Sequence, residues 1–145
     1  MKISTKGRYA LRVMIDLAIH DTGEYIALKD ISARQGITVK YLEQIVTTLG
    51  KAGLLRSMRG NNGGHRLAKK PEDYKIGDIL RTMEGDLAPV ECLQGEDNLC
   101  PKAEECSTLK FWKGLDDVVN EYVDRFTLKD LVTETEKNFG NDYSI

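Results

Sequence analysis

Residues 38–68 read TVKYLEQIVTTLGKAGLLRSMRGNNGGHRLA, and this stretch decides the fold. Thr38 can cap a helix from Val39 to Ala52, because its hydroxyl can accept a bond from the first turn. Gly53 ends that helix, and two extended segments follow it, residues 54–58 and 66–68. The turn between them is rich in glycine and asparagine, which predicts a β-hairpin. The apolar face of the helix consists of Leu42, Ile45, Val46 and Leu49.

The segment before this stretch predicts the first half of a helix-turn-helix. Residues 28–35 form a short helical pattern with Leu28, Ile31 and Ala33 facing inward, and Gly36 stops it. Two short helices joined by a tight glycine turn, followed at once by a hairpin, are typical of a winged helix-turn-helix that places its second helix in the DNA major groove. The alternative is a helical hairpin that only packs in a core.

The polar residues of the same stretch suit contact with DNA. Lys40, Tyr41, Glu43, Gln44 and Thr47 project mostly away from the apolar face. In the turn, Arg59 and Arg66 supply charge, and an arginine at the tip of a wing suits a narrow minor groove. No Gly-Lys-Ser/Thr follows the glycines, so the turn is not a nucleotide-binding loop. His65 is expected to have a structural role.

Four further helices are predicted around this unit. Residues 7–20 form the first, capped by Ser4 or Thr5, and residues 76–84 form another that Gly85 ends. Residues 104–126 give the longest helical pattern, and residues 127–137 restart a helix before a frayed tail. The expected inward residues are Leu11, Met14, Ile15 and Ala18 in the first, Ile76, Ile79, Leu80 and Met83 in the next, and Leu128, Leu131 and Val132 in the last.

The long helix carries an aromatic-rich stripe with heptad-like spacing: Trp112, Leu115, Val119, Tyr122 and Phe126. A small winged domain buries so long a stripe poorly, whereas pairing with a second copy of the chain would bury it. We therefore expect a homodimer, with packing of the helix on its own domain as the alternative. The fold class is mostly α: a winged helix-turn-helix DNA-binding domain with a small β-hairpin wing and a long C-terminal dimerisation helix.

Composition sets the remaining limits. The chain is 41% hydrophobic and 30% charged, with no apolar run of membrane-spanning length and no signal peptide at its N-terminus, which favours a cytoplasmic protein. Residues 1–75 hold 14 Lys or Arg against 7 Asp or Glu, net +7, whereas residues 76–145 hold 7 against 16, net −9. A basic half beside an acidic half suits a polyanion-binding module joined to a sensing or assembly module.

All three cysteines lie in one unpatterned stretch, at positions 92, 100 and 106. The spacing lacks the paired C-x2-C of structural zinc sites and the C-x-x-C of thioredoxin-type redox motifs. Thiolates favour soft metals, and loose spacing suits an iron–sulfur cluster, which usually takes four protein ligands. A carboxylate, a small molecule or the second subunit would supply the fourth; the candidate carboxylates are Glu91, Glu96, Asp97, Glu104 and Glu105. Three unligated thiols are the alternative.

The chain resembles the Rrf-two family of winged-helix regulators, whose branches include IscR, NsrR and CymR. Its marks are MKISTKGRYAL at residues 1–11, YLEQI at 41–45, RGNNGG at 59–64 and TLKDL at 127–131. The resemblance implies a homodimer on a roughly palindromic double-stranded operator. It implies DNA-binding roles for Lys6, Thr38, Lys40, Tyr41, Glu43, Gln44, Arg59, Gly60 and Asn61, and cluster ligation by Cys92, Cys100 and Cys106.

The chain combines a CymR-like N-terminal segment with an IscR-like cysteine loop and departs from both branches. Leu109 stands where IscR-like members have a histidine, so the fourth ligand of a 2Fe–2S or 4Fe–4S cluster is not identified. Arg8 stands where some nitric-oxide-sensing relatives have an acidic residue. The expected organisation is a DNA-binding domain at 1–85, a sensor loop at 86–107, a dimerisation helix and short helix at 108–135, and a tail at 136–145.

The expected function is that of a transcriptional repressor. It would regulate genes of iron–sulfur cluster assembly or of sulfur and cysteine metabolism through an iron–sulfur cluster. The alternative is a cluster-free repressor of cysteine metabolism controlled by thiol oxidation or by a protein partner. A small enzyme or a module that does not bind DNA is a third reading, against which stand the basic hairpin and the lack of a catalytic set of side chains.

Overall fold

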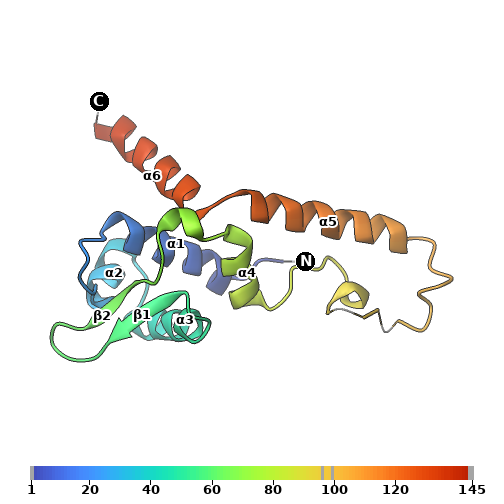
Figure 1. Cartoon of the computed structure of the whole chain (residues 1–145), viewed down its shortest axis with the longest axis horizontal. Coiled ribbons are helices and arrows are strands. Elements are labelled where there is room, and N and C mark those ends of the chain that lie inside the picture. Colours follow the sequence, from blue (N-terminus) through green and yellow to red (C-terminus); the bar gives the residue numbers. More distant parts are fainter. Residues whose placement is uncertain (1, 96, 99, 144–145) are drawn as a thin grey trace.

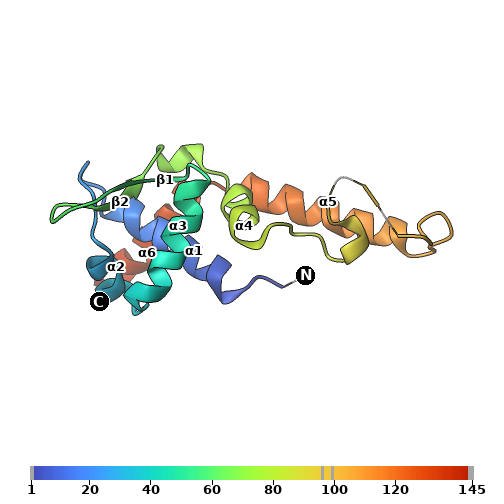
Figure 2. The same ribbon diagram turned by 90° about the horizontal axis from the view of Figure 1, so that it is seen from below.

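The computed structural model describes residues 2–95, 97–98 and 100–143 of the chain. Figures 1 and 2 show a head made of the N-terminal elements and an arm, α5, that projects from it together with the cysteine-containing loop. The helices and strands are α1 Thr5–Ile19, α2 Leu28–Gln35, α3 Val39–Lys51, β1 Leu55–Met58, β2 Gly64–Leu67, η1 Pro71–Asp73, α4 Ile76–Glu84, η2 Glu91–Leu93, α5 Leu109–Arg125 and α6 Leu128–Tyr143.

Helix α1 lies at the centre of the head. Ser4 caps it by accepting a hydrogen bond from the Gly7 N–H at 3.2 Å. The fully buried face consists of Ala10, Val13, Met14 and Leu17. The predicted stripe was therefore placed one residue out of phase: only Met14 of its four members is buried, and Leu11, Ile15 and Ala18 are partly exposed against the core. The sequence is apolar at both sets of positions, so it does not indicate which set faces the core.

The helix-turn-helix follows as predicted. Gly36 ends α2 in the left-handed conformation (φ 67°), a geometry that glycine adopts without steric cost. Thr38 then caps α3 by accepting from the Tyr41 N–H at 3.2 Å. The apolar face of α3, Leu42, Ile45, Val46 and Leu49, is buried as expected. In α2 only Ile31 is buried, and the prediction for Ala33 is wrong because that residue is exposed.

The wing is an antiparallel hairpin in which Leu55 pairs with Leu67 and Met58 with Gly64. Its tip is a turn closed by the Gly63 N–H donating to the Gly60 carbonyl at 3.0 Å. The return strand begins two residues earlier than predicted, at Gly64. Tyr74 fixes the base of the hairpin, because its buried hydroxyl donates to the Leu54 carbonyl at 2.6 Å and accepts from the two N–H groups of Ala68 and Lys69.

The C-terminal helices depart furthest from the prediction. Residues 104–108 are not helical, so α5 begins at Leu109, and α6 continues to Tyr143 instead of fraying near residue 136. Arg81 of α4 clamps the base of α5 by donating to both carboxylate oxygens of Asp124, at 2.8 and 2.9 Å, and to Asn120. This hydrogen bonding lowers the pKa of Asp124. No helix in the described ranges is long and apolar enough to cross a membrane.

Candidate nucleic-acid interface and cysteine loop

The outer face of α3 presents polar side chains that the fold leaves free. Lys40, Glu43 and Gln44 are exposed, and within the described part of the chain their side chains have no hydrogen-bond partner. The hydroxyl of Thr47 is instead turned back onto its own helix, donating to the Glu43 carbonyl at 2.6 Å. Because Thr38 caps the first turn and the opposite face is buried, these side chains project from a rigid support. A helix of this kind can enter a major groove.

Tyr41 differs from its exposed neighbours because it is half-buried. Its ring packs edge-on against Tyr9 of α1, with centroids 5.7 Å apart, and the Arg12 guanidinium lies 5.1 Å from the centre of the Tyr9 ring. Aromatic pairs of this geometry add about 0.5–1.5 kcal/mol to the free energy of burial alone. Tyr41 therefore holds the start of α3 against α1 and has only part of its surface available for DNA. Tyr9 and Arg12 were missed because nothing in sequence spacing relates them to residue 41.

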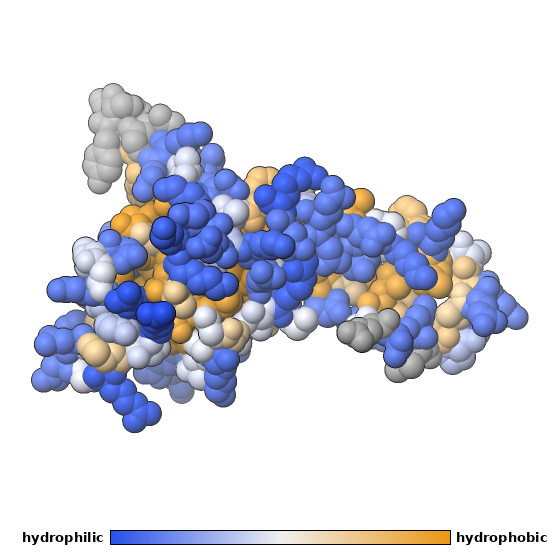
Figure 3. Space-filling view, in the orientation of Figure 1, coloured by the Kyte–Doolittle hydropathy of each residue, from blue (hydrophilic) through white to orange (hydrophobic). Residues whose placement is uncertain are grey.

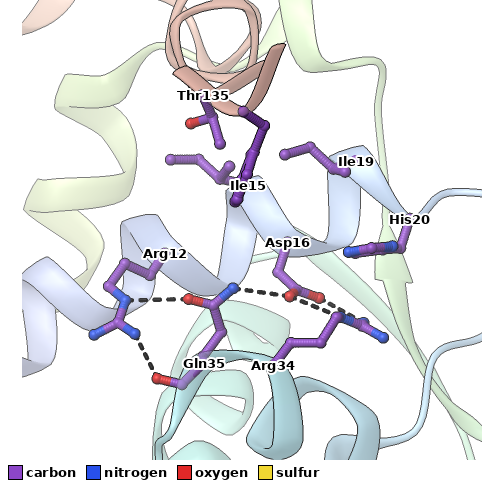
Figure 4. A pocket seen from close by; sticks show the side chains of 9 residues that line it. Arg12, Ile15, Asp16, Ile19, His20, Arg34, Gln35 and Thr135 are labelled. Atoms are coloured by element: carbon purple, nitrogen blue, oxygen red, sulfur yellow. Dashed lines mark hydrogen bonds and ion pairs between the residues drawn. The ribbon is translucent and has the colours of Figure 1, made fainter. Parts of the chain in front are cut away.

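A second contact fixes α2 to α1. Figure 4 shows Asp16 of α1 facing Arg34 and Gln35 at the end of α2. Asp16 is 2% exposed, and it accepts two hydrogen bonds from Arg34, at 2.7 and 3.0 Å, and one from Gln35 at 2.9 Å. These contacts raise the pKa of Arg34, chiefly through its hydrogen bond with Asp16. Arg12 completes the network by donating to the side chain and the backbone carbonyl of Gln35. The network sets the position of the turn that leads into α3.

The network forms one wall of a hollow of about 530 Å³ between α1, α2 and α6. Its opposite wall is apolar and includes Ile15, Ile19 and Phe139. Asp16 and Arg34 form an ion pair, so neither residue leaves an unpaired charge in the hollow.

The tip of the wing is exposed and unsupported by other elements. Arg59, Gly60 and Asn61 are all exposed, and Gly60 has φ 112°, a conformation that other residues rarely adopt. The Arg59 side chain has no hydrogen-bond partner within the described residues. The tip can therefore approach a groove without losing contacts that stabilise the protein.

Arg66 does not belong to this surface, contrary to the prediction. Its guanidinium donates to the Gly23 carbonyl at 2.8 Å and lies 5.5 Å from the centre of the Tyr25 ring. It ties the hairpin to the connection between α1 and α2. Arginine is a residue type that often contacts DNA, but the side chain of Arg66 points toward the head.

His65 is structural, as expected from the sequence. Its backbone exchanges two hydrogen bonds with Ile26, at 2.8 and 2.9 Å, and its Nδ1 lies 2.7 Å from the Ser57 Oγ across the hairpin. Burial lowers the pKa of His65. The backbone of His65 therefore joins the wing to the segment before α2, and its ring links the two strands of the hairpin.

The lowered pKa of His65 predicts an acid-sensitive contribution to stability. The unfolded chain binds a proton near pH 6.5, whereas the folded protein resists protonation until lower pH. The contribution is therefore complete above about pH 6.5 and is lost as the pH falls through the folded pKa. Urea unfolding between pH 7.5 and 5 should show a shallower loss for His65→Asn than for wild type. His20→Asn, at the exposed other histidine, should follow wild type; equal pH dependence of all three proteins would contradict the assignment.

The N-terminus of α1 is joined to the end of α4. The Ser4 N–H and hydroxyl both donate to Glu84 Oε1, at 2.9 and 2.6 Å. Glu84 is the last residue of α4, so the same contact fixes the start of the cysteine loop. Lys6, in the first turn of α1, is partly exposed. No local motif in the sequence indicates a contact between residues 4 and 84.

The structure brings two of the three cysteines to one place. Cys92 and Cys100 are half-buried and line a hollow of about 330 Å³ with Glu91, Gln94 and Asp97. Cys106 is exposed and is not among the residues that line this hollow. A hydrogen bond with the Thr108 hydroxyl, at 3.5 Å, lowers the pKa of Cys106. Of the candidate fourth ligands, Glu91 and Asp97 face the hollow, Glu104 and Glu105 do not line it, and Glu96 lies outside the described residues.

The thiols and carboxylates of the loop are suitable ligands for a cluster, but the structure does not bring all of them together. Two thiols and two carboxylates surround one hollow, and thiolates are the usual ligands of iron–sulfur clusters. Within residues 2–95, 97–98 and 100–143, however, no three Cys, His, Asp or Glu side chains are placed to hold a metal ion. A cluster held by all three cysteines does not fit this arrangement of the loop unless Cys106 moves.

The arm exposes an apolar stripe. Phe111, Val118 and Tyr122 of α5 are 67%, 62% and 56% exposed, and Figure 3 shows hydrophobic surface along the arm. The predicted stripe is divided: Val119 and Phe126 pack on the chain's own core, whereas Tyr122 is exposed. The free stripe therefore lies beside the packed one on α5. Apolar faces of this kind usually mark a site of protein association.

The chain is similar to known transcriptional regulators. The model of a family named Rrf2, described as iron-dependent transcriptional regulator, matches residues 3–134. Protein rrf2 of Nitratidesulfovibrio vulgaris strain Hildenborough is 40% identical over 134 residues, which cover 92% of this chain and 89% of that protein. The regulator CymR of Bacillus subtilis is 41% identical over 136 residues, 94% of this chain and 93% of CymR.

Solved structures give the same result. The structure of B. subtilis CymR, titled as its global cysteine regulator, matches with a TM-score of 0.74 at 40% identity, covering 92% of this chain and 98% of CymR. A structure titled T. potens IscR matches with a TM-score of 0.74 at 37% identity, covering 95% of this chain and 90% of IscR. Both are similar to this chain along the head and the arm.

Proposed function

Because the chain belongs to the Rrf2 family of transcriptional regulators, and is therefore a regulator and not an enzyme, we propose that it binds a specific DNA operator through α3 and the wing. The observation that carries the proposal is the free polar face of α3, held rigidly beside an unsupported basic wing tip. Base edges would be read by Gln44, which suits adenine, and by Glu43, which accepts from cytosine. The proposed interface comprises Lys6, Thr38, Lys40, Tyr41, Glu43, Gln44, Arg59, Gly60 and Asn61.

The proposal is tested by selecting duplexes from a random pool with the wild-type protein. Gln44→Ala should weaken binding to the selected duplex by about 1–3 kcal/mol, roughly 5- to 150-fold, because a bidentate base contact is lost. Binding to random DNA should change little, because phosphate contacts remain. Asn138→Ala, an exposed amide on α6, is the control in the same fluorescence titration. A wild-type protein that enriches no sequence would overturn the proposal.

The exposed stripe of α5 supports a homodimer, which we propose as the DNA-binding form. Two copies related by a two-fold axis would present two α3 helices to a roughly palindromic operator. We expect the protein to act in the cytoplasm as a repressor. We propose a matching division of the chain into a DNA-binding head at 1–85, a sensor loop at 86–107, a dimerisation helix with its following helix at 108–135, and a C-terminal tail at 136–145.

For the loop, we propose that Cys92 and Cys100, joined by Cys106 when it moves to their hollow, bind an iron–sulfur cluster of the 2Fe–2S or 4Fe–4S type, with an unidentified fourth ligand. The shared hollow of Cys92 and Cys100 supports this, as does the likeness to IscR. Such a cluster would respond to iron supply and to oxidants. The target genes proposed on the same ground are those of iron–sulfur cluster assembly or of sulfur and cysteine metabolism.

Cluster binding predicts a coloured protein. Material purified without oxygen should contain iron and sulfide and absorb visible light, whereas a variant with serine at positions 92, 100 and 106 should contain neither. Circular dichroism of the variant controls for folding, which should be unchanged because the three cysteines contribute little to the core. Iron-free, colourless wild-type protein would exclude the cluster and leave DNA binding untouched.

A cluster-free regulator is the second candidate, and Cys106 favours it. This thiol is exposed, and its hydrogen bond with Thr108 lowers its pKa, which increases the thiolate fraction that reacts with oxidants. The likeness to CymR, whose structure is titled as a global cysteine regulator, supports a role in sulfur metabolism, and we propose control there by a thiol or by a protein partner. Iron-free protein whose operator affinity changes reversibly with peroxide and thiol, and no longer does so in Cys106→Ser, would establish this alternative.

A further inference from the structure

A hollow of about 410 Å³ lies between the C-terminal half of α3 and the wing. The helix contributes Val46, Thr47, Gly50 and Lys51, and the hairpin contributes Ser57, Met58, Arg59 and His65. It is distinct from the base-reading residues Glu43 and Gln44, which lie a turn earlier on α3. None of the roles assigned above to the interface uses Lys51 or Ser57.

The position of this hollow follows from the geometry of duplex DNA. Adjacent major and minor grooves are separated by a single sugar–phosphate strand. A protein with α3 in the major groove and its wing tip at the neighbouring minor groove must straddle that strand. The space between α3 and the wing is where the strand would pass.

The chemistry of the lining suits a phosphodiester. Lys51 and Arg59 are exposed cations, one on each side, and the residues that line the hollow in the described part of the chain include no Asp or Glu. Ser57 and His65 add a neutral donor. One hydrogen joins the Ser57 Oγ to the His65 Nδ1, 2.7 Å apart, and the pair has two hydrogens when the ring is neutral. Whichever tautomer is present, one O–H or N–H remains to donate.

We propose that this hollow binds the phosphodiester strand between the two grooves, with Lys51 as its principal cation and the Ser57–His65 pair as a neutral donor. The inference rests on the proposed function and adds to it a binding site that carries affinity without sequence preference. Lys51 is the exposed last residue of α3 and has no ion-pair or hydrogen-bond partner within the described residues, so its charge is free for this role.

The test uses the duplex selected by wild-type protein and a random duplex of equal length. Lys51→Met should weaken binding to both by the same factor, about 5- to 10-fold, and reduce the salt dependence of log K by about 1 per protomer. Lys129→Met, an exposed lysine on α6, should behave as wild type. Neutral methylphosphonate placed at each position in turn should weaken wild type at one flanking phosphate per half-site, and Lys51→Met should be insensitive at that phosphate.

The outcomes separate this inference from the function on which it rests. If wild type selects a duplex but Lys51→Met binds both duplexes with unchanged affinity and salt dependence, the phosphate site is wrong and the operator interface stands. A loss confined to the selected duplex would also overturn it, because Lys51 would then read a base. A wild-type protein that selects no duplex overturns both.

Discussion

Replacing Asp16 by alanine is expected to lower the free energy of unfolding by about 2–3 kcal/mol. The carboxylate is buried and accepts three hydrogen bonds, so its loss leaves Arg34 and Gln35 without their partner. Breaking a fully buried ion pair costs about 3–5 kcal/mol. The expected loss is smaller here because the Arg34 side chain is 33% exposed and can turn toward water. Urea unfolding followed by circular dichroism measures the effect.

Asp78→Ala is the matched control. Asp78 is 59% exposed and lies 3.5 Å from Arg81, so its removal should change stability by no more than about 0.5 kcal/mol. Because the Asp16 contacts also position the turn before α3, Asp16→Ala should weaken operator binding even at temperatures where it remains folded. Equal stability of the two variants would show that the buried network contributes little.

Replacing Val118 by glutamate is expected to convert the proposed dimer into monomers. Val118 lies at the middle of the exposed stripe. A two-fold dimer formed through this stripe would bury two glutamates, one from each copy. Burying unpaired carboxylates costs several kcal/mol, so the dimer should dissociate at least about 100-fold more readily. Sedimentation equilibrium measures this. Affinity for a two-fold operator should fall by a similar factor, because the two reading heads are no longer linked.

Lys113→Glu places the same acidic side chain on α5 about 140° around the helix axis from Val118. It should leave the oligomeric state unchanged because it faces away from the stripe. A Val118→Glu protein that sediments like wild type would exclude this face as the interface, whatever the oligomeric state of wild type.

The reading head could be predicted from the sequence because its signals are local. A threonine cap, a glycine in the left-handed conformation and an apolar face at helical spacing all act within a few residues, and each is confirmed in α2 and α3. The polar face of α3 follows from that spacing. Tertiary contacts could not be predicted in the same way. Asp16 with Arg34 and Ser4 with Glu84 are separated by 18 and 80 residues, and no periodicity relates their positions.

For the arm, the side of α5 that packs on the head could not be predicted from the sequence. Helix α5 has apolar residues on two faces, and the sequence does not say which one packs on its own head. In the structure Val119, Val123 and Phe126 pack on the core and Arg81 pairs with Asp124, while Phe111, Val118 and Tyr122 stay exposed. The cysteine loop has no repeating pattern at all. Spacing alone indicated a soft-metal site there, but could not indicate that Cys106 stands apart from the hollow of Cys92 and Cys100.

The loop between α4 and α5 is anchored at both ends by contacts outside itself. Ser4 holds Glu84 on one side, and Arg81 holds Asp124 on the other. Leu87 and Ala88 are buried at the start of the loop, whereas none of the described residues from 91 to 108 is buried. The exposed part of the loop, after Val90, can therefore be replaced as a unit. A designer could replace it with a segment that binds another metal or ligand and expect the DNA-binding end to fold as before. Lineages of regulators could diversify their signals by the same route while keeping one way of reading DNA.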